Sequence, residues 1–171
     1  MIQPPQPNEY PAFAETYVAM IAAGADVLQI LADSALASHN LFSQLDEQQA
    51  AHAYAEDKWT VKQVLGHLID TERVFAFRAF CFSRELTTLP GFDQDVYVDN
   101  SDYNARTIQS LADEFKATRQ SNLYMFNTLT DAQLSNTGIA SGNPVTVRAL
   151  VYMAAGHELH HIKILNERYW Q

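Results

Sequence analysis

The chain has 171 residues and a mass of 19.2 kDa, which is the size of one ordinary domain with a substantial core. Its net charge of −9 argues against nucleic-acid binding, because an acidic protein repels phosphate backbones and the sequence has no basic cluster. A membrane span is not expected, since no apolar run reaches the roughly 18 residues that a helix needs to cross a bilayer.

The N-terminal residues and the cysteine content predict where the protein resides. The first ten residues carry no basic side chain before the prolines and no apolar segment, so we expect no secretory signal. Cys81 is the single cysteine, which excludes an internal disulfide or a thiolate cluster and favours a reducing cytoplasm. Four prolines within residues 1–11 indicate an extended arm over residues 1–10, and we expect residues 1–171 to form one domain.

Long segments without glycine or proline predict an all-α fold. Residues 25–65 and 92–137 contain neither residue type, whereas an all-β domain needs turn residues about every 8–12 positions. Their richness in Ala, Leu, Gln and Glu favours helices. The predicted helices cover residues 10–44, 60–83, 105–129 and 146 to nearly the C-terminus.

Capping residues support three of these helix boundaries. The first helix is expected to bend or break near Gly24, with Asp26 available as a new N-cap. Thr60 and Gln63 match a capping box, in which a hydroxyl at the N-cap is followed three residues later by an amide side chain. Thr146 follows a proline and is the expected cap of the last helix.

Residues 84–104 lack helical periodicity and form an unusually long connection. If the second and third helices run parallel, the chain must return along a helix of about 24 residues, or ~36 Å. About 20 extended residues reach ~66 Å, so such a crossover is feasible. The sequence therefore predicts a four-helix bundle with a long crossover between helices two and three, and the connection can also act as a lid over a site.

Two histidines on the last helix indicate a metal site. His157 and His161 are one turn apart, about 40° around the helix, and their side chains project into its apolar stripe. Buried imidazoles need partners, because an unpaired polar group in a core costs about 1–3 kcal/mol. A divalent ion bound by both nitrogens meets this need. The alternative is a pair of core histidines that are hydrogen-bonded to other protein groups.

A third histidine on the second helix completes the predicted site. His67 lies at the flank of that helix's apolar face, whereas His39 and His52 lie in polar surroundings. Gly66 and Gly156 directly precede His67 and His157, and each glycine costs roughly 1 kcal/mol against alanine in a helix interior. Small residues there allow close helix approach or ligand access. We therefore predict that His67, His157 and His161 form one site that joins the second and fourth helices.

Residues 157–161 also match the H-E-x-x-H motif of zinc proteases, in which Glu158 would be the general base. Only ten residues follow His161, none of them is histidine, and no strand is evident to hold a peptide, so the protease interpretation is disfavoured. Glu158 and Asp70 are the candidate catalytic residues, with Thr71 and Arg78 as further candidates for contacts around the site. The alternative role for each is structural.

Three segments resemble the DinB/YfiT-like superfamily of metal-binding four-helix bundles. They are WTVKQVLGHLIDTERVFAFRA (59–79), LPGFDQDVYV (89–98) and AGHELHHIKILNERYW (155–170). The resemblance covers about 40–171 and implies an up-down-down-up bundle with one divalent ion, bound by His67, His157 and His161. The chain departs from relatives before Lys58-Trp59, where Glu56-Asp57 replaces a frequent Pro-Gly turn; this departure affects no ligand.

The predicted function follows from the open coordination position that three neutral imidazoles leave on an ion. Such an ion lowers the pKa of bound water toward ~7 and deprotonates a coordinated thiol. We expect a zinc- or nickel-dependent enzyme that delivers a thiolate or hydroxide to a small electrophilic substrate. The resemblance implies an S-transferase with a low-molecular-weight thiol such as bacillithiol, or a metal-dependent hydrolase. A non-catalytic, stress-associated metal-binding homodimer and a purely structural bundle are the alternatives.

Overall fold

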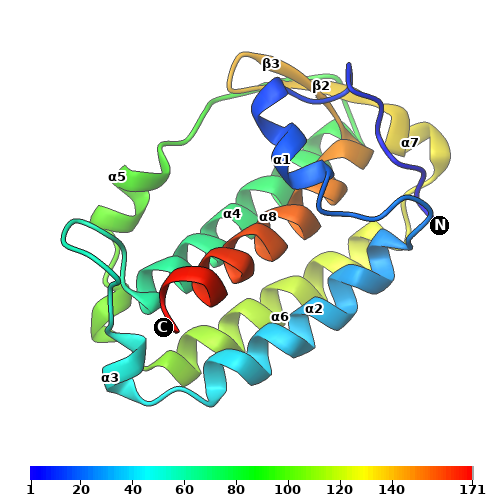
Figure 1. Ribbon diagram of the computed structural model, residues 1–171. Helices are drawn as coiled ribbons and strands as arrows, with labels where there is room; N and C mark the ends of the chain where they lie inside the picture. Colours follow the sequence, from blue (N-terminus) through cyan, green and yellow to red (C-terminus); the bar gives the residue numbers. More distant parts are fainter. Residues whose placement is uncertain (171) are drawn as a thin grey trace.

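The computed structural model describes residues 1–170, in which four long helices pack side by side as a bundle (Figure 1). They are α2 (Val27–Ser43), α4 (Val61–Phe82), α6 (Ile108–Phe126) and α8 (Val147–Arg168). Helices α2 and α4 each pack against both α6 and α8, and two clusters of buried apolar side chains fill the space between them. No helix of the described residues has the length and apolar character that a bilayer-spanning helix requires.

The long helices begin at side-chain caps. The Asp26 carboxylate caps α2, and Thr60 and Gln63 form the predicted capping box at the start of α4. Thr146 caps α8 as predicted, while α6, which Thr107 caps, begins three residues later than the expected residue 105. Each cap accepts a hydrogen bond from an amide that has no partner within the helix, which explains why these boundaries could be read from the sequence.

The predicted helix over residues 10–44 is wrong in its first half. Residues 12–14 form a 3₁₀ turn, η1 (Ala12–Ala14), and α1 (Glu15–Val18) is a single turn of helix. The chain then reverses at Gly24, whose φ of +79° is a left-handed conformation that side chains other than glycine rarely adopt. The break near Gly24 was expected, but its extent was underestimated.

The all-α prediction also missed a small three-stranded sheet. Its strands are β1 (Thr88–Leu89), β2 (Thr137–Ala140) and β3 (Asn143–Thr146), in the order β1-β2-β3. Strand β1 pairs parallel to β2, and β2 pairs antiparallel to β3 through a two-residue turn at Ser141 and Gly142, both with positive φ. Strands of two to four residues are too short to show a period, so the pattern of the sequence does not reveal them.

The connection between α4 and α6 runs back along the bundle (Figure 1). It contains β1, α5 (Gln94–Asp99) and the 3₁₀ turn η2 (Tyr103–Ala105), of which α5 and η2 pack against α4. Two further one-turn helices, α3 (Glu47–Ala50) and α7 (Asp131–Ser135), lie in the remaining connections. A helical bundle with a long second connection is therefore observed, whereas the full up-down-down-up order stays a prediction.

The N-terminal segment packs over the first turns of α8. Ile2 is buried, and its carbonyl accepts a hydrogen bond of 3.0 Å from the Tyr152 hydroxyl. Helix α1 then lies directly on α8, where the backbone carbonyl of Tyr17 faces Gly156 so closely that any Cβ on that glycine would overlap it. Gly156 is therefore required for the close approach of two chain segments.

Replacing Gly156 by alanine is expected to lower the free energy of unfolding by about 1–3 kcal/mol, despite the better helix propensity of alanine. The added Cβ would overlap the backbone oxygen of Tyr17. Because a backbone atom cannot rotate away as a side chain can, α1 must shift. Urea unfolding, together with protease sensitivity of residues 10–26, measures both effects. Gly91→Ala is the control, since its nearest contact would be at 3.3 Å to the Ser141 hydroxyl; an equal loss in both variants would contradict the explanation.

Candidate metal centre

Three histidine side chains converge where α4 packs against α8. His67 comes from α4, and His157 and His161 come from successive turns of α8. Their ring centroids are 4.5–4.9 Å apart, and one nitrogen from each ring lies within 4.8 Å of the other two. The Nε2 atoms of His67 and His157 are 3.0 Å apart. Two nitrogens bound to one tetrahedral zinc ion are about 3.3 Å apart, so small side-chain movements suffice for both to reach a shared ion.

Neighbouring segments hold the histidine rings in place. The Trp59 ring lies 4.9 Å from that of His67, and the Tyr17 ring meets His157 edge-on at 5.2 Å. A Cβ on Gly66 would overlap the ring of Tyr103, just as one on Gly156 would overlap α1. The glycine beside each of the two buried histidines therefore allows a chain segment to pack closely, which is the first of the two roles that the sequence suggested.

Burial keeps the three imidazoles neutral. Removal from water lowers the pKa of His67 to about 4 and that of His161 to about 3. The pKa of His157 falls well below its ordinary value, first because of burial and then because of the neighbouring histidines. Neutral imidazole is the form that binds metal, so the environment favours the ligand state at physiological pH.

The polar contacts of the rings leave one nitrogen of each ring directed at the other two. Thr71 Oγ1 lies 3.4 Å from Nδ1 of His67, which leaves Nε2 directed at the other rings. Within the described residues, the His161 ring has no hydrogen-bond partner at all. Three neutral imidazoles whose nitrogens face one another within 4.8 Å form a ligand set suited to a divalent cation.

In the metal-free protein, acid is expected to lower the free energy of unfolding as the pH falls from about 6.5 to 4. Histidines of the unfolded chain bind protons near pH 6.5, whereas His67 and His161 in the folded protein do so only near pH 4 and pH 3. The unfolded state therefore holds more protons in this interval. The contribution of these histidines to the free energy of unfolding is fully present above pH 6.5 and declines below it. Urea unfolding at several pH values measures this decline.

The matched variants are His161→Ala, which should reduce the pH dependence, and His52→Ala, which removes an exposed histidine outside the three-histidine site as the control. A free energy of unfolding that is constant between pH 6.5 and 4 in the metal-free protein would contradict the burial argument.

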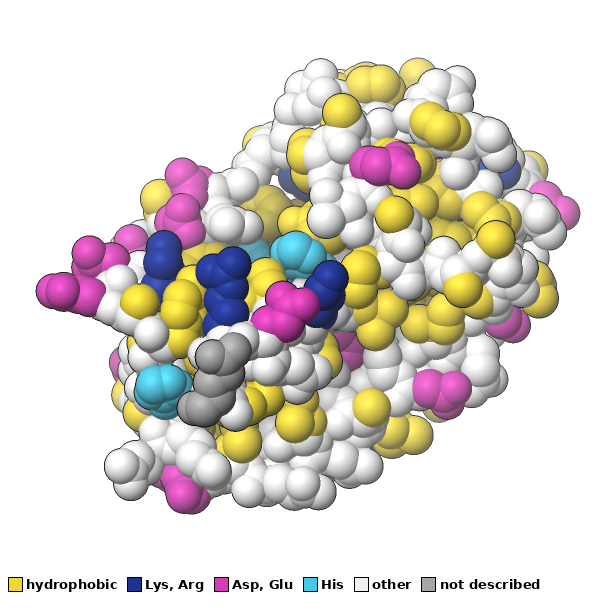
Figure 2. Space-filling model, viewed as in Figure 1, with side chains coloured by type: hydrophobic (Ala, Val, Ile, Leu, Met, Phe, Trp, Pro, Cys, Tyr) yellow, Lys and Arg dark blue, Asp and Glu magenta, His cyan; other side chains and the backbone are white. Residues whose placement is uncertain are grey.

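Two cavities flank the three histidines. Cavity A, of about 530 Å³, is lined by His67 and His157 together with Tyr17, Phe75, Arg78 and Phe92. Cavity B, of about 660 Å³, is lined by His161 together with Trp59, Asp57, Asp95, Asp99 and Tyr169. Figure 2 shows histidine side chains beside a recess in this face, with hydrophobic side chains around them. The site is thus reachable from two sides.

The long connection between α4 and α6 contributes walls to both cavities. Gly91, Phe92 and Asp93 line cavity A, Asp95 and Asp99 line cavity B, and Gln94 lines both. The sequence left open whether this segment is a connection or a cover for a site. It lies against the site as well as joining the helices, because α5 packs on α4 and Gln94 of α5 lines both cavities.

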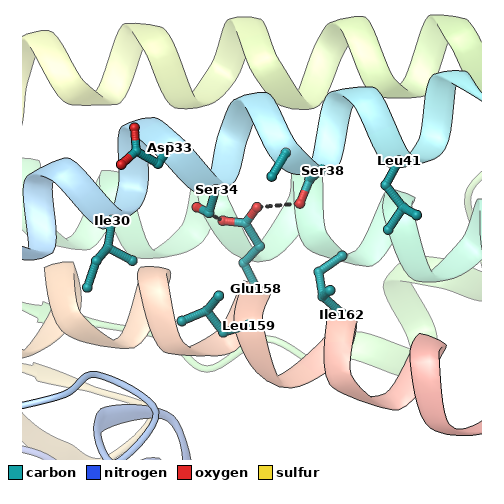
Figure 3. Close-up of a pocket in the computed structure, with 9 residues that line it drawn as sticks. Ile30, Asp33, Ser34, Ser38, Leu41, Glu158, Leu159 and Ile162 are labelled. Carbon is teal, nitrogen blue, oxygen red and sulfur yellow. Dashed lines mark hydrogen bonds between the residues drawn. The ribbon is translucent and has the colours of Figure 1, made fainter.

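Glu158, the first candidate catalytic residue, points away from the histidines. Its carboxylate accepts hydrogen bonds of 2.6 Å from both Ser34 and Ser38 of α2 (Figure 3). It also accepts a hydrogen bond of 2.8 Å from Arg119 of α6. Glu158 follows His157 directly in a helix, so the two side chains lie about 100° apart and face different neighbours. We assign no chemical step to Glu158.

Arg119 is a buried residue that sequence reasoning missed. Its guanidinium binds Glu158 and, through two hydrogen bonds of 2.8 and 3.0 Å, the carboxylate of Glu72 on α4. Burial alone would lower the pKa of Arg119, but the two carboxylates raise it above its ordinary value. The capping and histidine motifs gave no sign of this cluster, because its members come from four separate helices.

The remaining candidate residues lie at different places. Asp70 accepts a hydrogen bond from Tyr103, which together with burial raises the pKa of that tyrosine, and it is not among the residues that line either cavity. Thr71 and Arg78 both line cavity A. His160 packs its ring against Tyr17, at the edge of the site.

Comparison with known proteins gives the same fold. YfiT from Bacillus subtilis, described as a probable metal-dependent hydrolase with an unusual four-helix bundle topology, matches with a TM-score of 0.76 and 17% identity, over 95% of this chain and 89% of that one. YjoA, a DinB-like protein from the same organism, matches with a TM-score of 0.61 and 19% identity, over 84% of this chain and 88% of that one.

At these identities the solved structures show a shared fold alone, and no curated protein sequence matches the chain. The family comparison goes further, because the family described as the DinB superfamily matches residues 25–165. This match includes α2, α4, α6 and all but the last residues of α8, with the three converging histidines among them. The chain belongs to the DinB superfamily.

Proposed function

We propose that this protein is a divalent-metal-dependent enzyme whose ion, zinc or nickel, is bound by His67, His157 and His161. The observation that supports this proposal is the convergence of three neutral imidazoles from two helices at the boundary of two cavities. Three protein ligands leave a coordination position open, which is typical of catalytic metal sites. The description of YfiT as a probable metal-dependent hydrolase is consistent with this proposal.

The bound ion would supply Lewis acidity, which turns a coordinated thiol or water into a nucleophile near neutral pH. The residues of this chain would bind the ion, orient its ligands and line the space for a substrate. The three histidines hold the ion in their neutral form, and Thr71 orients the ring of His67. The aromatic side chains of cavity A, Tyr17, Phe75 and Phe92, exclude water from one side of the site and offer apolar surface to a small substrate.

Activation of a low-molecular-weight thiol is the reaction that we favour, with a small electrophile as the second substrate. Two separate cavities meet the histidines from different sides, which suits a reaction that joins two molecules. Hydrolysis, with water as nucleophile, is the alternative reaction at the same ion. The catalytic roles of Glu158 and Asp70 stay predictions from the sequence; neither residue lines cavity A or cavity B, and the proposal assigns no chemical step to either.

A non-catalytic role as a metal-binding homodimer in the cytoplasm is the second candidate. It is favoured by exposed aromatic side chains on the outer surface of the bundle, where Phe77 and Phe80 lie on α4 and Tyr124 lies on α6. Such side chains are candidates for a protein interface. A dimer without catalysis should bind metal but consume no thiol.

The experiment measures metal content first and reaction second. Protein purified without a nickel column is expected to contain one divalent ion per chain by elemental analysis. The loaded protein should accelerate the consumption of a small thiol by a generic electrophile, and a chelator should abolish this acceleration. A chelator-sensitive release of acid from an ester without thiol would instead favour hydrolysis. Metal binding without either activity would favour the binding protein, and absence of bound metal would refute the proposal.

A further inference from the structure

Arg78 is a buried cation at the wall of cavity A. It lies on α4, its side chain is 7% exposed, and one of its terminal nitrogens, Nη2, donates hydrogen bonds to the Pro90 carbonyl at 3.0 Å and the Ser141 hydroxyl at 3.1 Å. Both acceptors are neutral. The guanidinium carbon also lies 5.8 Å from the centre of the Phe92 ring. The protein therefore places a positive charge at the cavity wall, and the groups that it contacts directly are uncharged.

The charge of Arg78 has no carboxylate partner among residues 1–170. Asp93 is the acidic residue that lines the same cavity in the described chain, but its carboxylate caps α5 by accepting from the amides of Asp95 and Val96. Burial lowers the pKa of Arg78, in contrast to Arg119, whose two carboxylate partners raise its pKa. Buried cations are normally paired, and this chain carries 20 acidic residues, so a missing counter-charge is unexpected.

The position of Arg78 relative to the histidines defines the size of a ligand. Arg78 follows His67 by eleven residues, which is three turns of helix, about 16 Å along the axis and on the same face. Arg78 and His67 both line cavity A, so the guanidinium and the imidazole border the same space. Thr71 and Phe75 of α4 line the cavity as well, together with Phe92 and Tyr17. The space between cation and histidines is thus largely aromatic.

We propose that Arg78 binds the anionic group of a ligand whose apolar or aromatic body lies in cavity A and whose other end reaches the three histidines. A planar guanidinium with free donors matches a carboxylate, phosphate or sulfonate, and the aromatic walls match the rest of such a molecule. This role of Arg78 rests on the proposed function, because it assigns the chemical class of that enzyme's substrate. Anion recognition itself requires no metal, so the two proposals can fail separately.

The test uses chelator-treated protein, in which a carboxylate cannot bind to an ion. Calorimetric titration compares 4-phenylbutyrate with 4-phenylbutanol, which has the same aromatic body but no charge. We expect the carboxylate to bind about tenfold more tightly or better, because a hydrogen bond to a charged partner is stronger than one to a neutral partner. Arg78→Gln should abolish this preference, and Arg78→Lys should retain part of it.

Arg84→Gln is the matched control, since Arg84 lies shortly after α4 but packs on the exposed ring of Phe80 outside the cavity. It should leave the preference unchanged. Equal binding of the two probes by the unaltered protein, or no binding of the carboxylate, overturns the inference even if the Arg78 variants do not fold. An unchanged preference in folded Arg78→Gln protein also overturns it. Chelator-insensitive thiol consumption beside an intact carboxylate preference would refute the metal-dependent function alone.

Discussion

Replacing Arg119 by methionine is expected to lower the free energy of unfolding by about 3–5 kcal/mol. The substitution preserves most of the apolar volume but removes the guanidinium that pairs with the buried carboxylates of both Glu72 and Glu158. Both carboxylates would remain buried without a counter-charge, and a buried charge that has lost its partner strongly destabilises the folded state. Urea or thermal unfolding followed by circular dichroism measures the loss.

Arg73→Gln is the control for this experiment, because Arg73 also pairs with glutamate but is half-exposed on the surface of α4. Its loss should be about 0–1 kcal/mol. Combining Arg119→Met with Glu72→Gln and Glu158→Gln should recover part of the stability, since the uncompensated charges are then gone. A single Arg119→Met variant as stable as the Arg73→Gln control would show that the cluster contributes little.

Replacing His161 by alanine is expected to weaken metal binding by more than about a hundredfold. Loss of a partner that merely orients a ligand already reduces metal affinity about 10- to 100-fold, and His161 supplies one of the three nitrogens themselves. Competition titration with a metal-sensitive chelator measures the affinity. The ring of His161 is partly exposed at cavity B, so the variant should fold normally.

His160→Ala is the matched variant, because it removes the neighbouring imidazole on the same helix. His160 packs against Tyr17 and lies at the edge of the site, outside the group of three whose nitrogens converge. It should change metal affinity by less than about tenfold, which is the low end for an outer partner. Equal losses from the two variants would refute the ligand assignment.

Local patterns of the sequence predicted the parts of the fold that depend on neighbouring residues. The caps at Asp26, Thr60 and Thr146 were predicted because a cap involves only the next few residues. The convergence of His67 with His157 and His161 was predicted because their helices carry them on inward-facing stripes.

Contacts between distant segments of the chain could not be predicted from local sequence patterns. Strand β1 forms only by pairing with β2, some fifty residues later, and neither strand is long enough to show alternation. Glu158 became a catalytic candidate through the H-E-x-x-H match of residues 157–161, but in the structure its carboxylate faces α2 and α6. Its partner Arg119 lies on another helix, so the motif alone could not reveal the contacts of Glu158.

The placement of the Arg119 cluster has a consequence for the histidines. Glu72 lies little more than one turn after His67 on α4, and Glu158 directly follows His157 on α8. The guanidinium of Arg119 therefore joins the two helices that carry the histidines through its hydrogen bonds to both glutamates. The spacing of the imidazoles is therefore set by charged groups that lie outside the three-histidine site. We expect such a scaffold to keep the three rings in place whether or not the proposed ion is bound.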